Sequence, residues 1–214
     1  MIKQFEFNHF QVNCYVVYDE ATRQCAVVDP APEASYEDAM LNQFIDKEHL
    51  SPTLVLLTHA HIDHIAGLQQ ICERYHLPVT MHEGGAHLLR QSELYGSVMG
   101  FAVDAVALEQ LPRHYIADDE RLSVGGLTIE ARYVPGHCPG SLCYVLDSEK
   151  SVLTGDTLFR FSVGRSDLPG GNHQLLIDKI RSRLLTLPDD YVVLPGHGIS
   201  STIGKEKKYN EFLS

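Results

Sequence analysis

The stretch Thr58-His59-Ala60-His61-Ile62-Asp63-His64 holds four side chains that commonly bind metals, all within six residues. Three imidazoles and a carboxylate this close together are costly as core filler, because each needs a polar partner once water is removed. An apolar run, 53–57, precedes the cluster, and Ile65-Ala66-Gly67-Leu68 follows it. The cluster is therefore expected where a buried strand ends and a helix begins. Histidine and aspartate in this setting favour zinc, iron or manganese.

Three later segments repeat this arrangement, in which a short apolar, β-branched run ends in a tight turn with one ligand-type residue. Sites in sheet-built folds gather at strand ends, where loops converge over a rigid scaffold. Together with the first cluster, these three segments supply five imidazoles and two carboxylates, which predicts a binuclear metal site. The three later runs are 129–134, 151–154 and 191–194, and the residues that follow them are His137, Asp156 and His197.

Length, charge and cysteine content limit the class of protein. A chain of 214 residues can bury roughly 70% of its unfolded surface, so a single domain over residues 1–214 is expected. The formal charge of −11, with no long basic cluster, disfavours a nucleic-acid partner. No segment is long and apolar enough for a membrane span, and residues 1–7 lack the pattern of a secretion signal. Five scattered cysteines argue against a disulfide framework and favour a reducing, cytoplasmic location.

The predicted elements run strands-helix-strand-helix and then repeat that order. We therefore expect two similar halves packed sheet to sheet, with helices outside. Residues 84–116 contain several glycines and no strand period, so they are expected to form short helices and a lid-like insertion near the site. Strands are predicted at 5–7, 12–18, 25–29, 53–57, 79–81, 121–124, 127–134, 142–146, 151–154 and 191–194, and helices at 36–47, 67–76, 172–185 and 204–212.

The ordered pattern His59-x-His61-x-Asp63-His64, then His137, Asp156 and His197, resembles the metallo-β-lactamase fold superfamily over essentially the whole chain. Within it, the sequence is similar to the single-domain branch of glyoxalase II, the hydroxyacylglutathione hydrolases. The resemblance implies a four-layer αββα sandwich of two mixed β-sheets, with the metals at one edge. The segments that carry the narrower resemblance are 155–159, 164–167, 195–198 and 201–206.

The resemblance also implies how the ligands divide between two divalent ions, with zinc expected and iron or manganese as alternatives. In an extended segment, residues two apart point to the same side, and those past the bend address a neighbouring ion. Two ions about 3.5–4 Å apart can hold a nucleophile between them. The first ion would be bound by His59, His61 and His137, the second by Asp63, His64 and His197, and both by the bridging Asp156.

The implied reaction is hydrolysis of a small acyl thioester such as S-lactoylglutathione by a metal-bridging hydroxide. Asp63 would orient this hydroxide in addition to binding the second ion. The thiolate leaves readily because its pKa is roughly 8.5. The substrate-loop lysine of the family aligns with Arg165, which can hold a substrate carboxylate or pair with Asp167 or Asp156. Cys138 replaces the threonine usual in the family; packing is expected for it, with redox or metal chemistry as the alternative. The oligomeric state is left open between monomer and homodimer.

Other functions fit parts of the same pattern. A mononuclear iron persulfide dioxygenase resembles the chain through the first motif and residues 164–167, but it would leave the second ligand set unused. A non-catalytic metal-binding module is the third alternative, which a complete ligand set disfavours. A lactonase or β-lactamase remains open on fold grounds, because a fold does not determine a function.

Overall fold

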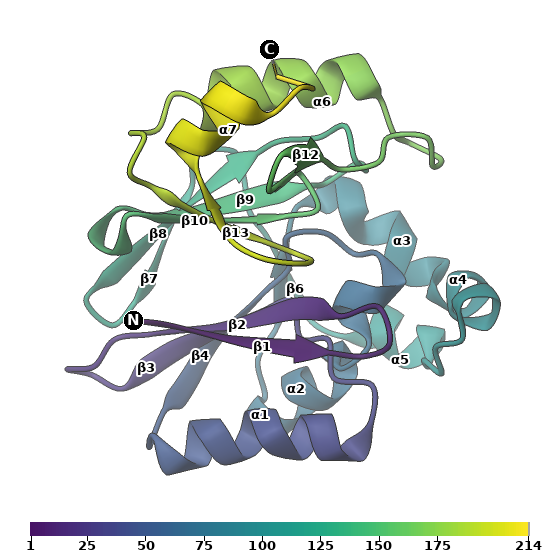
Figure 1. Cartoon of the computed structure of the whole chain (residues 1–214). Helices are drawn as coiled ribbons and strands as arrows, with labels where there is room; N and C mark the ends of the chain where they lie inside the picture. Colours follow the sequence, from purple (N-terminus) through teal and green to yellow (C-terminus); the bar gives the residue numbers. More distant parts are fainter. Residues whose placement is uncertain (214) are drawn as a thin grey trace.

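The computed structural model describes residues 1–213. Two six-stranded mixed sheets lie face to face, with helices on both outer surfaces, as Figure 1 shows. This four-layer αββα arrangement confirms the predicted fold. The first sheet contains, in spatial order, β1 (Ile2–Phe7), β2 (Val12–Tyr18), β3 (Gln24–Val28), β4 (Ser51–Leu56), β5 (Val79–Met81) and β6 (Arg113–Tyr115).

The second sheet is bordered by a short two-stranded hairpin, β11 (Leu158–Phe159) and β12 (Ser162–Val163). Its parallel pair, β10 with β13, corresponds to the parallel pair β3 with β4 of the first sheet. In spatial order it contains β14 (Ser201–Thr202), β13 (Val192–Pro195), β10 (Ser151–Gly155), β9 (Leu142–Leu146), β8 (Leu127–Tyr133) and β7 (Arg121–Val124).

The helices form two outer layers and one group at an edge of the molecule (Figure 1). The first sheet is covered by α1 (Ser35–Lys47) and α2 (Leu68–Tyr75). The second is covered by α6 (His173–Lys179), which continues into a π-helical turn at Ile180–Leu184, and by α7 (Ile203–Tyr209). Three short helices lie at the edge: α3 (Ala86–Arg90), α4 (Ser92–Met99) and α5 (Ala105–Gln110). None of the helices within residues 1–213 has both the length and the apolarity needed to cross a bilayer.

Side-chain alternation along the central strands explains why both faces of each sheet are covered. In β2, Val12, Cys14 and Val16 are buried on the helix side, while Tyr15 and Val17 are buried between the sheets. Successive side chains of a strand point to opposite faces, so a strand that is apolar throughout requires cover on both sides. The sandwich follows from this pattern.

The segment expected as short helices and a lid differs from the prediction at its end. Residues 86–110 form the three short helices, but Arg113–Tyr115 is the edge strand β6, paired in parallel with β5. A three-residue strand with exposed polar side chains has no apolar period to reveal it. Whether α3–α5 act as a lid stays a prediction, as does the single-domain organisation.

Candidate metal centre

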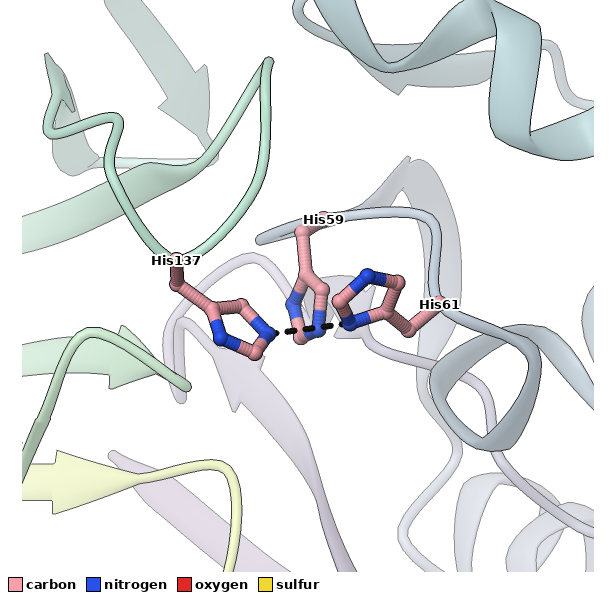
Figure 2. A group of neighbouring side chains, drawn as sticks. All are labelled: His59, His61 and His137. Atoms are coloured by element: carbon pink, nitrogen blue, oxygen red, sulfur yellow. Dashed lines mark hydrogen bonds between the residues drawn. The ribbon is translucent and has the colours of Figure 1, made fainter. Parts of the chain in front are cut away.

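The seven predicted ligands come together at one edge of the sandwich, from loops that follow β4, β8, β10 and β13. His59, His61 and His137 form a first group, whose ligand atoms all lie within 4.8 Å of one another. Their rings point toward one another, and Nε2 of His137 lies 2.9 Å from Nδ1 of His61 (Figure 2). Two segments 76 residues apart in the chain thus present nitrogen atoms to the same point.

A second group comprises Asp63, His64 and His197, again with ligand atoms within 4.8 Å of one another. The 3₁₀ turn Ile62–Ile65 carries the first two, and the turn after β13 carries His197. Nε2 of His197 lies 3.3 Å from Nε2 of His64 and 3.2 Å from Oδ2 of Asp63. This group therefore offers two nitrogens and one carboxylate oxygen.

Asp156 lies between the two groups. Its Oδ1 is 3.4 Å from Nε2 of His64, and its Oδ2 is 3.8 Å from Nε2 of His137 and 3.6 Å from Nε2 of His197. Each carboxylate oxygen thus faces at least one imidazole of the second group, and one of them also faces the first. This is the placement that a bridging carboxylate needs.

The donor spacing and the unpaired polar atoms fit divalent metal ions. Two nitrogens that each lie about 2.1 Å from a tetrahedral ion are about 3.4 Å apart, close to the spacings within both groups. Nε2 of His59 and Oδ1 of Asp156 are buried, and neither has a hydrogen-bond partner among residues 1–213. Buried polar atoms are normally paired, and cations bound to the two groups would provide partners for these atoms. The mixture of imidazole and carboxylate suits zinc, iron or manganese.

Asp29 orients one imidazole of each group through hydrogen bonds, a role that was not predicted from the sequence. Its carboxylate accepts hydrogen bonds from the backbone N–H of Thr58 at 2.7 Å, from Oγ1 of Thr58 at 2.6 Å and from Nδ1 of His64 at 2.9 Å. Because Oγ1 of Thr58 donates to Asp29, it accepts from Nδ1 of His59 at 3.1 Å. The signal available in the sequence is an acidic residue directly before Pro30, at the end of the strand predicted at 25–29; in the structure Asp29 follows β3.

Backbone carbonyls orient two more imidazoles. Nδ1 of His137 donates to the carbonyl of Arg165 at 2.8 Å, and Nδ1 of His197 donates to the carbonyl of Phe10 at 3.0 Å. A ring whose Nδ1 carries the proton presents Nε2 as the free lone pair. His61 differs, since its Nδ1 faces the first group. The neighbouring structure thus selects which nitrogen of each ring is available to a metal.

Burial and the neighbouring charged groups together set the charge of these side chains. It lowers the pKa of His59, His61 and His137, and that of His61 falls to about 4, so all three are neutral near pH 7, as metal ligands must be. Burial acts the same way on His64, but the surrounding carboxylates, Asp156 first, raise its pKa well above the ordinary value. The pKa of Asp156 is lowered by His64 and the other imidazoles against the opposing effect of burial.

Residues 8–197 match the family model of the metallo-beta-lactamase superfamily. The chain belongs to this superfamily. It is 36% identical over 204 residues to the probable metallo-hydrolase YqgX of Bacillus subtilis, covering 95% of this chain and 93% of that protein. It is 33% identical over 205 residues to the hydroxyacylglutathione hydrolase GloC of Haemophilus influenzae, covering 96% and 94%. Among solved structures, BLEG-1 B3 metallo-beta-lactamase matches with a TM-score of 0.89 at 34% identity, covering 100% of both chains.

A pocket of about 240 Å³ opens onto the metal centre of this superfamily member. One side of it is apolar and comes from the loop after β1 and from α3 and α4. The loop between β12 and α6 also contributes to the lining. Apart from five of the predicted ligands, the pocket is lined by Phe10, Ile62, Leu88, Tyr95, Met99, Arg165, Leu168 and Pro169.

Two further predicted residues have distinct environments. Arg165 lines the pocket, and its guanidinium forms two 2.9 Å hydrogen bonds with Asp167, one of the partners expected for it. Cys138 is fully buried, its Sγ lies 3.3 Å from Oγ of Ser141, and burial raises the pKa of its thiol to about 12. A buried thiol that stays protonated is a poor nucleophile, which favours packing as the role of Cys138.

Proposed function

We propose that this chain is a binuclear metal-dependent hydrolase that cleaves a small acyl thioester such as S-lactoylglutathione. The observation that carries the proposal is the pair of complete three-residue groups joined by the Asp156 carboxylate. In a mononuclear centre, the second group would hold no metal, although its imidazoles are oriented for binding one. Similarity to a hydroxyacylglutathione hydrolase over nearly the whole chain supports the choice of a thioester.

The mechanism assigns separate tasks to the side chains. The two groups would hold divalent ions, most simply zinc with iron or manganese also suitable, which would supply a water-derived nucleophile near neutral pH and polarise the scissile carbonyl. Asp63, whose Oδ2 faces the second group, orients the attacking water and holds its proton. The leaving thiolate, with a pKa of roughly 8.5, departs without a general acid. No serine or cysteine nucleophile is needed.

Arg165 is proposed as a substrate contact at the rim of the pocket. Its ion pair with Asp167 is exposed on both sides, with 59% and 70% of the side chains accessible. Exposed ion pairs contribute only about 0–1 kcal/mol, so exchanging Asp167 for a substrate carboxylate costs little. We propose that the protein acts in the cytoplasm, as a monomer or a homodimer.

The test is the metal content of freshly purified protein, measured by inductively coupled plasma mass spectrometry, with S-lactoylglutathione hydrolysis assayed in the same preparation. Close to two ions per chain together with hydrolysis is the expected result. One iron per chain, no hydrolysis, and oxygen uptake with glutathione persulfide would assign the chain to the dioxygenase class instead. Hydrolysis of a β-lactam or a lactone in place of the thioester would keep the metal centre and replace the substrate.

A further inference from the structure

Four apolar side chains that line the pocket are referred to here as the apolar wall: Phe10, Leu88, Tyr95 and Met99. Tyr95 and Met99 are four residues apart on α4 and so lie on the same face of the helix. Both are half-buried and pack against the core of the first sheet, and Leu88 of α3 is 4% exposed. The three side chains from α3 and α4 therefore have fixed positions within the fold, which is required of a surface that selects a substrate.

The apolar wall is tied to the metal centre through the loop after β1. His9 Nε2 lies 3.0 Å from the carbonyl of Met99, and the ring of Phe10 lies 5.4 Å from that of Phe101. The carbonyl of Phe10 accepts the hydrogen bond that orients His197. In addition, α4 packs on the 3₁₀ turn that carries Asp63. The wall thus has a defined position relative to the atoms that would attack a carbonyl.

The two sides of the pocket differ in chemistry. The apolar wall offers hydrocarbon, an aromatic face and a thioether, whereas the loop between β12 and α6 adds the cationic Arg165 beside Leu168 and Pro169. A thioester has two substituents on its carbonyl group: an acyl chain and a thiol carrier that bears carboxylates. Burying a carboxylate against the apolar wall is unfavourable, and leaving an alkyl chain beside the guanidinium gains nothing. The orientation that satisfies both sides directs the acyl chain to the wall.

We propose that the apolar wall is the acyl-binding surface, and that it selects thioesters with aliphatic acyl chains over those with polar hydroxyacyl groups. This inference rests on the proposed function and narrows it to a substrate class. Each methylene that leaves water for an apolar surface gains enough free energy to change kcat/KM about fourfold. The preference should therefore rise with chain length until the pocket is full.

The experiment measures kcat/KM for a series of glutathione thioesters whose acyl groups are acetyl, propionyl, butyryl, hexanoyl and D-lactoyl. We expect kcat/KM to rise about fourfold per methylene over the first members, and D-lactoyl to rank below butyryl. If all the thioesters are inactive, the proposed function fails. If the thioesters are hydrolysed but kcat/KM is flat or falls with chain length, the thioesterase stands and the acyl-binding wall is wrong.

Variants of α4 locate the effect. Met99→Gln keeps the length of the side chain and makes the wall polar, so the hexanoyl-to-acetyl ratio of kcat/KM should fall at least tenfold. The matched control is Val98→Gln, the next residue on the same helix, whose side chain is 76% exposed and points away from the pocket; the ratio should not change. Should Met99→Gln not fold, Met99→Phe fills the pocket without adding polarity and should shorten the preferred chain. A ratio that is the same in wild type and in the folded Met99 variant contradicts the proposal.

Discussion

At the scale of single residues, Asp63 is the group whose loss should separate activity from folding. Asp63→Ala removes an oxygen that lies 3.2 Å from Nε2 of His197 and 3.8 Å from Nε2 of His64. In the proposed mechanism the second ion would lose a ligand and the attacking water its orienting carboxylate, so hydrolysis should fall at least about 100-fold. Hydrolysis rates and far-UV circular dichroism test this together. A variant with wild-type turnover would contradict the binuclear mechanism.

Substitution of Asp29 should lower the affinity for metal, although Asp29 is not one of the predicted ligands. Three donors converge on its carboxylate, and Asn offers one acceptor oxygen and an amide that is itself a donor. In Asp29→Asn, the amide must therefore face either Thr58 or Nδ1 of His64. Loss of such an orienting partner typically weakens metal binding about 10–100-fold. Competition with a chelator of known affinity measures the change.

The matched control is Asp46→Asn, which removes the same charge from a side chain that is 68% exposed and lies 3.7 Å from Arg74. Its metal affinity should equal that of the wild type. Equal affinities in the Asp29 and Asp46 variants would mean that the hydrogen bonds to His64 and Thr58 do not set the geometry of the site.

At the scale of elements, close contact between α6 and the turn before His137 positions the first ligand group. Gly136 has φ of +132°, and a Cβ there would lie 2.5 Å from the backbone nitrogen of Leu176 in α6. Its carbonyl accepts from the backbone N–H of Asn172, the N-cap of the same helix. Gly136→Ala should destabilise the protein by about 3 kcal/mol or more and displace His137, as measured by urea unfolding and metal content.

Gly100→Ala separates backbone strain from steric clash. Gly100 also has positive φ, +86°, but a Cβ there meets nothing closer than the ring of His9 at 3.8 Å. Its substitution should cost only about 1–2 kcal/mol and leave the metal content unchanged. If the Gly136 variant loses no more stability than the Gly100 variant, the turn before His137 has more freedom than its contact with α6 implies.

At the scale of the whole molecule, the metal centre joins the two sheets. Loops of the first sheet supply four of the predicted ligands, and loops of the second supply His137, Asp156 and His197. Ions bound only by the folded state stabilise it by about 4 kcal/mol when their concentration is 1,000 times Kd. For a chain of this size, removal of the metal with EDTA should therefore lower Tm by roughly 10 °C. Zinc added in excess should restore it, and an unchanged Tm would show that the ions do not hold the sheets together.

The fold and the clustering of ligand-type residues could be predicted because both depend on local sequence patterns. Nearly continuous apolar runs such as β2 and β9, and ligand-type residues placed directly after strands, depend only on neighbours in the chain. Edge strand β6 was missed for the complementary reason: Arg113–Tyr115 has no apolar period, and it is a strand only because β5 lies beside it.

Local patterns in the chain specify the layers of the sandwich, the strand ends at which a site could form, and the imidazoles and carboxylates available there. How those groups are held depends on contacts between segments that are distant in the chain. Asp29 and His64 are 35 residues apart, and the carbonyls of Phe10 and Arg165 carry no residue-specific signal. The apolar wall likewise requires α4 to be folded against the loop after β1. Hydrogen bonds between distant segments and contacts across a pocket depend on chain geometry, which no local pattern encodes.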